Sequence, residues 1–110
     1  MRNKALVVAT LVLTIIVIPQ LVFADATAPD GAAIYKTKCS SCHGADGKGQ
    51  TSVGKAMKIA DLGGADVQKM TDAEIAKIIE SGKGKMPAYK GKLTADEINA
   101  LVKAIRAFKK

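Results

Sequence analysis

The chain has 110 residues and a formal net charge of +7, with two Tyr, two Phe and no Trp. This length allows one small domain and excludes a multidomain enzyme. A chain this short with so few aromatic residues builds only a marginal core by itself.

Residues 1–24 have the layout of a secretory signal peptide. Two basic residues precede an apolar run from Ala5 to Ile18, Pro19 ends that run, and cleavage is expected after Ala24 or Ala26. The alternative is a retained membrane anchor, because this segment is nearly long enough to span a bilayer. We therefore expect residues 25–110 to form an exported domain. It would lie in the periplasm, or at the periplasmic face of the inner membrane if the segment is retained.

A first helix is predicted over residues 31–43, with Asp30 as its cap. It ends in a segment that contains the only two cysteines, Cys39 and Cys42, and the only histidine, His43. Two cysteines three apart, followed by histidine, form the attachment signature for c-type haem. Positions i, i+3 and i+4 of a helix share one face. Both thiols could therefore add to the porphyrin vinyl groups while the imidazole reaches the iron.

Three other uses of this motif remain open from the residues alone. A disulfide would close a very short loop and stabilise little. A thioredoxin-like dithiol normally accompanies a βαβ pattern, which this sequence lacks. A zinc site would lack a fourth ligand of the usual type. The spacing favours covalent haem over each of these alternatives.

Residues 45–64 are rich in Gly, Lys and Asp and show no sustained periodicity. We expect mostly an Ω-like loop on the histidine side of the haem. A short helical turn is predicted within residues 55–62. Its side chains Met57, Ile59 and Leu62 are expected to point inward.

Two later helices begin with nearly the same sequence. Thr71 and Thr94 each follow an apolar residue and precede a Glu by three positions, which is the pattern of a capping box with a hydrophobic staple. These signals predict helices over residues 72–81 and 95–108. No segment alternates at period two, so we expect an all-α fold without a sheet. The apolar stripes are Ile75, Ile78 and Ile79 in one helix and Ile98, Leu101, Val102, Ile105 and Phe108 in the other.

The loop between these helices contains Met86, the candidate for the second iron ligand. Two glycines before it give the strap reach, and Pro87 after it fixes the backbone. A thioether suits haem iron, and a His/Met pair raises the reduction potential. Met57 as ligand and an open iron position are the alternatives, whereas Met70 is explained as a staple residue.

From about Pro29 to its end the chain resembles a class I monohaem cytochrome c, of the small bacterial or c6-like kind. The resemblance implies a cytochrome c fold of three to four helices wrapped around one covalently bound haem. Cys39 and Cys42 would hold this haem covalently, with His43 and Met86 as its axial iron ligands. The matching segments are Cys39-Ser40-Ser41-Cys42-His43-Gly44, Met86-Pro87-Ala88-Tyr89 and Leu93-Thr94-Ala95-Asp96-Glu97-Ile98.

The resemblance also implies three packing details. A glycine and an aromatic residue, Gly31 and Tyr35 here, pack against the last helix in this family. The family's imidazole donates its second N–H to a proline carbonyl, and since that proline is absent we expect a carbonyl of residues 52–54 to serve. An aromatic residue frequent in the family's last helix is Ala104 here, so the contact between first and last helices would be thinner, or Phe108 would take over part of it.

An iron with both axial positions filled exchanges electrons but does not readily bind a substrate. The sequence also offers no second histidine, acid pair or nucleophile–base set for catalysis. We therefore expect an electron carrier and not an enzyme. The alternatives are a haem-based sensor or peroxidase-like enzyme with a labile Met86, and a haem-free dithiol oxidoreductase.

The net positive charge of the chain suggests a negatively charged partner. The lysines near the strap and the motif could form an ordinary solvated face. They could instead steer docking to an acidic redox-partner protein or an anionic membrane surface. We expect a monomer, and nucleic acid is a poor partner for an exported protein. The lysines concerned are Lys36, Lys38, Lys83, Lys85, Lys90 and Lys92.

The marginal core generates a first prediction. Haem would supply the missing apolar mass, so protein prepared without haem should be largely unfolded. Circular dichroism during thermal melting tests this directly. A cooperative, native-like melt of the haem-free protein would contradict the prediction.

Overall fold

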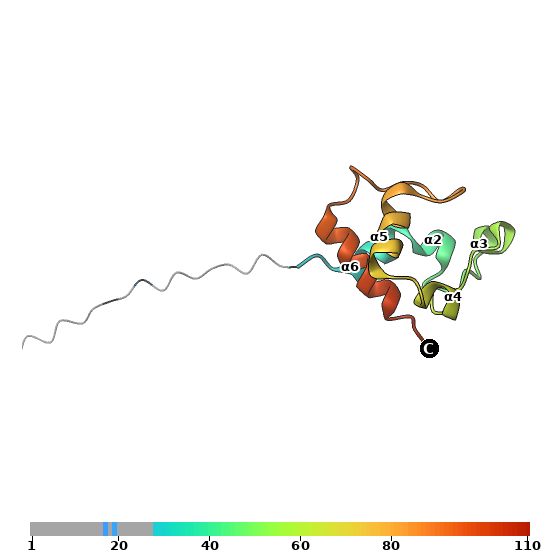
Figure 1. Cartoon of the computed structure of the whole chain (residues 1–110), viewed down its shortest axis with the longest axis horizontal. Coiled ribbons are helices and arrows are strands. Elements are labelled where there is room, and N and C mark those ends of the chain that lie inside the picture. The colour runs from blue at the N-terminus through green and yellow to red at the C-terminus, as the bar shows by residue number, and fades with distance from the viewer. Residues whose placement is uncertain (1–16, 18, 20–27) are drawn as a thin grey trace, which may run out of the picture.

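Every regular element in the described part of the chain is a helix, as Figure 1 shows. The computed structural model describes Val17, Pro19 and residues 28–110. Within this part, β-type pairing is limited to isolated bridges, so the prediction of an all-α fold is confirmed. The helices are α1 (Gly31–Lys38), α2 (Ser40–His43), α3 (Ser52–Met57), α4 (Ala65–Gln68), α5 (Asp72–Ser81) and α6 (Ala95–Arg106).

The predicted signal segment and residues 25–27 lie outside the described residues, apart from Val17 and Pro19. None of the helices within residues 28–110 has the length and apolarity needed to cross a membrane.

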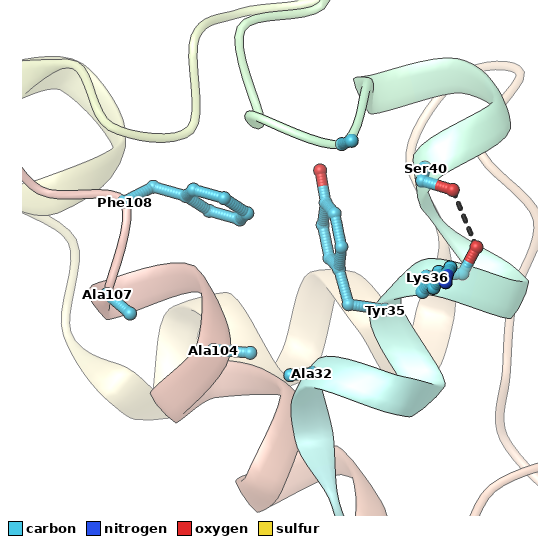
Figure 2. Close-up of a pocket in the computed structure, with 8 residues that line it drawn as sticks. Ala32, Tyr35, Lys36, Ser40, Ala104, Ala107 and Phe108 are labelled. Atoms are coloured by element: carbon cyan, nitrogen blue, oxygen red, sulfur yellow. Dashed lines mark hydrogen bonds between the residues drawn. The ribbon is translucent and has the colours of Figure 1, made fainter.

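The predicted helix over residues 31–43 is interrupted at Cys39, which separates α1 from α2. The amide of Cys42 donates to the carbonyl of Cys39 at 3.2 Å and not to that of Lys38, four residues back. The Ser40 hydroxyl donates to the Lys36 carbonyl at 2.6 Å, the dashed line in Figure 2. Side-chain hydroxyls that bond to helix carbonyls compete with the backbone ladder and bend helices. The prediction of one continuous helix is therefore wrong at this residue.

Three predicted caps begin α1, α5 and α6. Asp30 Oδ1 accepts from the amides of residues 32 and 33. At Thr71 both hydrogen bonds of the capping box form, because the Glu74 side chain returns a bond to the Thr71 amide. At Thr94 only the bond from the Glu97 amide forms, so the second capping box is half right. The bounds of α5 match the prediction, whereas α6 ends at Arg106 and not at residue 108.

The core lies where α1, α5 and α6 pack together. Gly31 lets α1 approach α6 closely, because a Cβ at this position would clash with the backbone carbonyl of Ala100. The expected packing of Gly31 and Tyr35 against the last helix is thus present. Of the predicted stripes, Ile78 and Phe108 are only partly buried. The buried apolar residues in the described part of the chain are Tyr35, Ile75, Ile79, Ile98, Leu101, Val102 and Ile105.

Phe108 takes over the contact that an aromatic residue at position 104 would make. Its ring lies 5.0 Å from that of Tyr35, with the two planes tilted by 57°. Figure 2 shows the two rings side by side above the small side chains of Ala32, Ala104 and Ala107. A pocket of about 370 Å³ remains among these residues, and none of the four predicted haem-binding residues lines it.

The short helix α4, which the sequence analysis did not predict, is tied to the end of α6. The guanidinium of Arg106 donates to the carbonyls of Gln68 and Met70 and pairs with Asp72 at 2.8 Å. The side-chain amide of Gln68 in turn donates from Nε2 to the Ile105 carbonyl at 3.0 Å. Last-turn carbonyls of a helix need outside donors, and Arg106 supplies one for α4.

The side chains expected to point inward from residues 55–62 differ in their burial. Met57 is 41% exposed, so the prediction for this residue is wrong. Ile59 is half-buried, and Leu62 packs against the core. The helical turn itself forms earlier than predicted, as α3, which lies at the edge of the domain in Figure 1.

The close approach at Gly31 generates a second prediction. Replacing Gly31 by Ala should lower the free energy of unfolding by about 1–3 kcal/mol, because a backbone carbonyl cannot move aside as a side chain can. This loss outweighs the helix-propensity gain of Ala over Gly, which is about 1 kcal/mol at most. Denaturant unfolding of the haem-loaded protein measures the change. Ala33→Val, at an exposed position of the same helix, is the control and should cost less than about 1 kcal/mol.

Candidate functional site

The four residues of α2 carry Cys42 and His43 and are held mainly by residues outside the helix. The Cys42 carbonyl accepts from the Thr51 hydroxyl at 2.6 Å, and the His43 carbonyl accepts from the Gly49 amide at 2.7 Å. The Gly44 carbonyl accepts from the Tyr35 hydroxyl, also at 2.6 Å. Last-turn carbonyls are normally orphaned. Three donors from outside the helix, two of them in the loop before α3, fix the backbone that presents the imidazole.

Thr51 and Gly54, which are not among the predicted site residues, bring α3 against α2. The Thr51 hydroxyl caps α3 by accepting from the Gly54 amide at 2.8 Å while it donates to Cys42. A Cβ at Gly54 would clash with the carbonyls of Gly49 and Cys42. A Thr placed before a short helix is a recognisable cap signal. The close approach of Gly54, by contrast, has no local signature.

The structure places Cys39 and Cys42 at the two ends of one helical turn, as predicted. Both thiols are free and half-buried. Burial raises the pKa of Cys39, and the neighbouring Cys42 raises it further. Two free thiols separated by two residues, directly before a histidine, fit covalent attachment of a porphyrin. The predicted alternative of a disulfide is not formed in this structure.

His43 is half-buried beside them. Burial lowers the pKa of its imidazole and so favours the neutral form, which is the form that binds metals. Its Nδ1 atom is buried and has no hydrogen-bond partner among the described residues. The predicted acceptor among the carbonyls of residues 52–54 is therefore absent. A half-buried imidazole that favours the neutral form fits the role of an axial iron ligand.

Met86 lies on a strap, residues 82–90, that follows α5. The strap turns back on itself because the amide of Met86 donates to the carbonyl of Lys83 at 3.0 Å. Gly84, with φ of +58°, lies inside this turn and allows it, while Gly82, with φ of +73°, ends α5, and a Cβ at Gly82 would press on the Met86 carbonyl. Met86 is half-buried and packs against the core cluster, as Cys39 does. The rival Met57 lies on the exposed side of α3, and Met70 packs against the core as expected of a staple residue.

The far end of the strap is fastened at Tyr89 and Lys90. Their amides donate to the carbonyls of Ile79 and Glu80, the last-turn acceptors of α5, each at 3.0 Å. The Tyr89 hydroxyl donates to the carbonyl of Lys38, also at 3.0 Å. The strap is thereby connected both to α5 and to the helix that leads into Cys39.

The predicted lysines around the strap and the motif are all exposed. None of them lies within ion-pair distance of a carboxylate in residues 28–110. Their positive charge is therefore available to a partner. They are Lys36, Lys38, Lys83, Lys85, Lys90 and Lys92.

The sequence is similar to one family model and to curated proteins that are all cytochromes. A family model described as "Cytochrome C oxidase, cbb3-type, subunit III" matches residues 26–103. Cytochrome c6 of Microcystis aeruginosa is 35% identical over 78 residues, which cover 71% of this chain and 93% of that protein. Cytochrome c6 of Leptolyngbya boryana is 37% identical over 78 residues, with coverage of 71% and 86%.

Solved structures of similar shape are also c-type cytochromes. The KustC0563 c-type cytochrome is 37% identical, with a TM-score of 0.69 over 74% of this chain and 99% of that one. Cytochrome c6C from Synechococcus sp. PCC 7002 is 30% identical, with a TM-score of 0.55 over 69% and 89%.

Proposed function

Because the chain belongs to the small class I c-type cytochromes, and is thus an electron carrier with one covalently bound haem c, we propose which residues bind that haem. Cys39 and Cys42 form the two thioether links, and His43 and Met86 are the axial iron ligands. One observation carries the assignment of the first three. They are the only cysteines and the only histidine in the chain, and they lie together on α2 and the residue before it.

The residues of this chain contribute fixed geometry to electron transfer. When bound, the haem supplies the ferrous/ferric couple, and a His/Met ligand pair raises its potential. The hydrogen bonds to the carbonyls of Cys42, His43 and Gly44 hold in place the backbone that carries the imidazole. The anchored strap does the same for Met86. A site that needs little rearrangement between oxidation states favours electron transfer over ligand binding, as expected for a carrier and not for a sensor or peroxidase-like enzyme.

The partner that we propose is an acidic redox protein. Exposed lysines without ion pairs in the described residues flank the Met86 strap and precede Cys39. Such a positive surface speeds encounter with a negatively charged partner. An anionic membrane surface is the second candidate partner for these lysines. The alternative to both is an ordinary solvated face that binds no partner. We propose that the carrier works as a monomer.

We also propose that residues 1–24 are a signal peptide and that residues 25–110 form the cytochrome domain in the periplasm. The basic start, the apolar run and the small residues near Ala24 support export. If the segment is retained as an anchor, the domain lies at the periplasmic face of the inner membrane. The mass of the intact mature protein distinguishes the two forms.

Replacing Met86 by Ala generates a third prediction. The variant should lose the sulfur-to-iron charge-transfer band of the oxidised protein, because no thioether then reaches the iron. Met57→Ala is the matched control, since it removes the rival methionine, and it should keep the band. Absorption spectra of the two oxidised variants decide whether Met86 or Met57 is the iron ligand. A band that survives in the Met86 variant, or that disappears in the Met57 variant, would reverse the assignment.

The lysine surface generates a fourth prediction. Oxidation of the reduced protein by ferricyanide, an anion, should slow by about tenfold or more from low to high ionic strength. Reversing two charges in Lys83→Glu/Lys85→Glu should remove most of this dependence. Lys77→Glu/Lys103→Glu changes the net charge equally on exposed helix faces and should remove less of it. Stopped-flow rates at several salt concentrations test this, and equal behaviour of the two double variants would argue for a merely solvated face.

A further inference from the structure

The Tyr89 hydroxyl connects the Met86 strap to α1, and the proposed haem ligands do not explain this connection. It donates to the Lys38 carbonyl at 3.0 Å, across 51 residues of sequence. Within residues 28–110, this is the one hydrogen bond that connects the Met86 strap to α1 or α2. It joins the segment that carries the sixth ligand to the residue directly before the first haem-binding cysteine.

The Lys38 carbonyl is available because the helix breaks at Cys39. In an unbroken helix this carbonyl would accept from the amide of Cys42, which donates to the Cys39 carbonyl instead. A backbone carbonyl left without a donor is costly unless water or a side chain satisfies it. The Tyr89 hydroxyl supplies that donor. The break in the helix and the position of the tyrosine therefore belong to one arrangement.

The backbone of Tyr89 is fixed by hydrogen bonds to segments other than α1. Its amide donates to the Ile79 carbonyl, and its own carbonyl accepts from the amides of Lys92 and Leu93. Its ring packs against the core cluster, as Met86 does. The residue between Met86 and Ala88 is Pro87, which has no amide proton to anchor it. Tyr89 is thus the first firmly held point of the strap after Met86.

From this arrangement we propose that Tyr89 is a positioning residue, whose hydroxyl latches the strap onto the end of α1 and keeps Met86 at the iron. The inference rests on the proposed function, because it takes Met86 as the axial ligand. Without the hydroxyl the ring still packs, but the strap separates more readily from α1. Met86 then leaves the iron more often, and an added ligand competes for the position more easily.

Imidazole binding to the oxidised, haem-loaded protein measures this opening. A ligand that binds only the open state has an apparent affinity in proportion to the population of that state. Tyr89→Phe removes the hydroxyl and keeps the ring. Since this hydrogen bond is open to solvent, its loss should raise the apparent imidazole affinity by about two- to fivefold. Amide hydrogen exchange at Met86 and Tyr89 should accelerate in the same variant.

Ser40→Ala is the matched control. The Ser40 hydroxyl satisfies the Lys36 carbonyl at the same helix break, at 2.6 Å, but makes no hydrogen bond to the strap. It should lower the denaturation midpoint as Tyr89→Phe does, and it should leave the imidazole affinity and the exchange at Met86 unchanged. A change confined to Tyr89→Phe supports the latch. An unchanged affinity in Tyr89→Phe, or an equal rise in both variants, overturns it.

The charge-transfer band of the unsubstituted protein keeps this result separate from the ligand assignment. If that band is absent from the native oxidised protein, the assignment of Met86 fails. If the band is present and Tyr89→Phe binds imidazole as the native protein does, the assignment stands and the latch is wrong.

Discussion

The structure depends on how the backbone carbonyls around residues 36–44 are satisfied. A helix of four residues cannot hold itself, since the first turn costs more entropy than its few hydrogen bonds return. Here α2 is held by donors from elsewhere: Thr51, Gly49 and Tyr35 at its end, and Tyr89 at the break before it. These donors come from three separate segments, which are α1, the loop before α3 and the Met86 strap. The geometry of Cys39, Cys42 and His43 is therefore a property of the whole domain.

The scaffold that brings those donors together is small. Its buried core forms where α6 packs against α1 and α5, and the absence of a side chain at Gly31 makes the close approach of α1 to α6 possible. Phe108 and Tyr35 extend that contact, and a pocket remains beside Ala104. Arg106 adds a polar closure between the end of α6 and the segment from α4 to α5. A core of this size leaves a large share of the stability to the covalently bound haem.

The Met86 strap meets two requirements that usually conflict. In the proposed function it has to be exposed enough for its lysines to meet a partner, yet rigid enough to keep the proposed neutral ligand in place. The structure separates the two along the sequence. Lys83 and Lys85 lie exposed on the turn, whereas Gly82 and Tyr89 at its ends are held by α5 and, for Tyr89, by α1. Charge and rigidity therefore come from different residues of the same short segment.

The sequence by itself determined whatever depends on near neighbours. The caps at Asp30 and Thr71 and the apolar stripe of α6 act within a few residues, so their patterns predicted the helices and the absence of a sheet. The haem-binding motif is local for the same reason. Only the tertiary structure decided the break at Cys39, the existence of α4, the exposure of Met57 and the contact from Tyr89 to Lys38. Apart from the local bond from Ser40 to Lys36 at the break, these features depend on segments far apart in the sequence, and several depend on a backbone carbonyl. Because every residue has that group, its partner leaves no signature in the sequence.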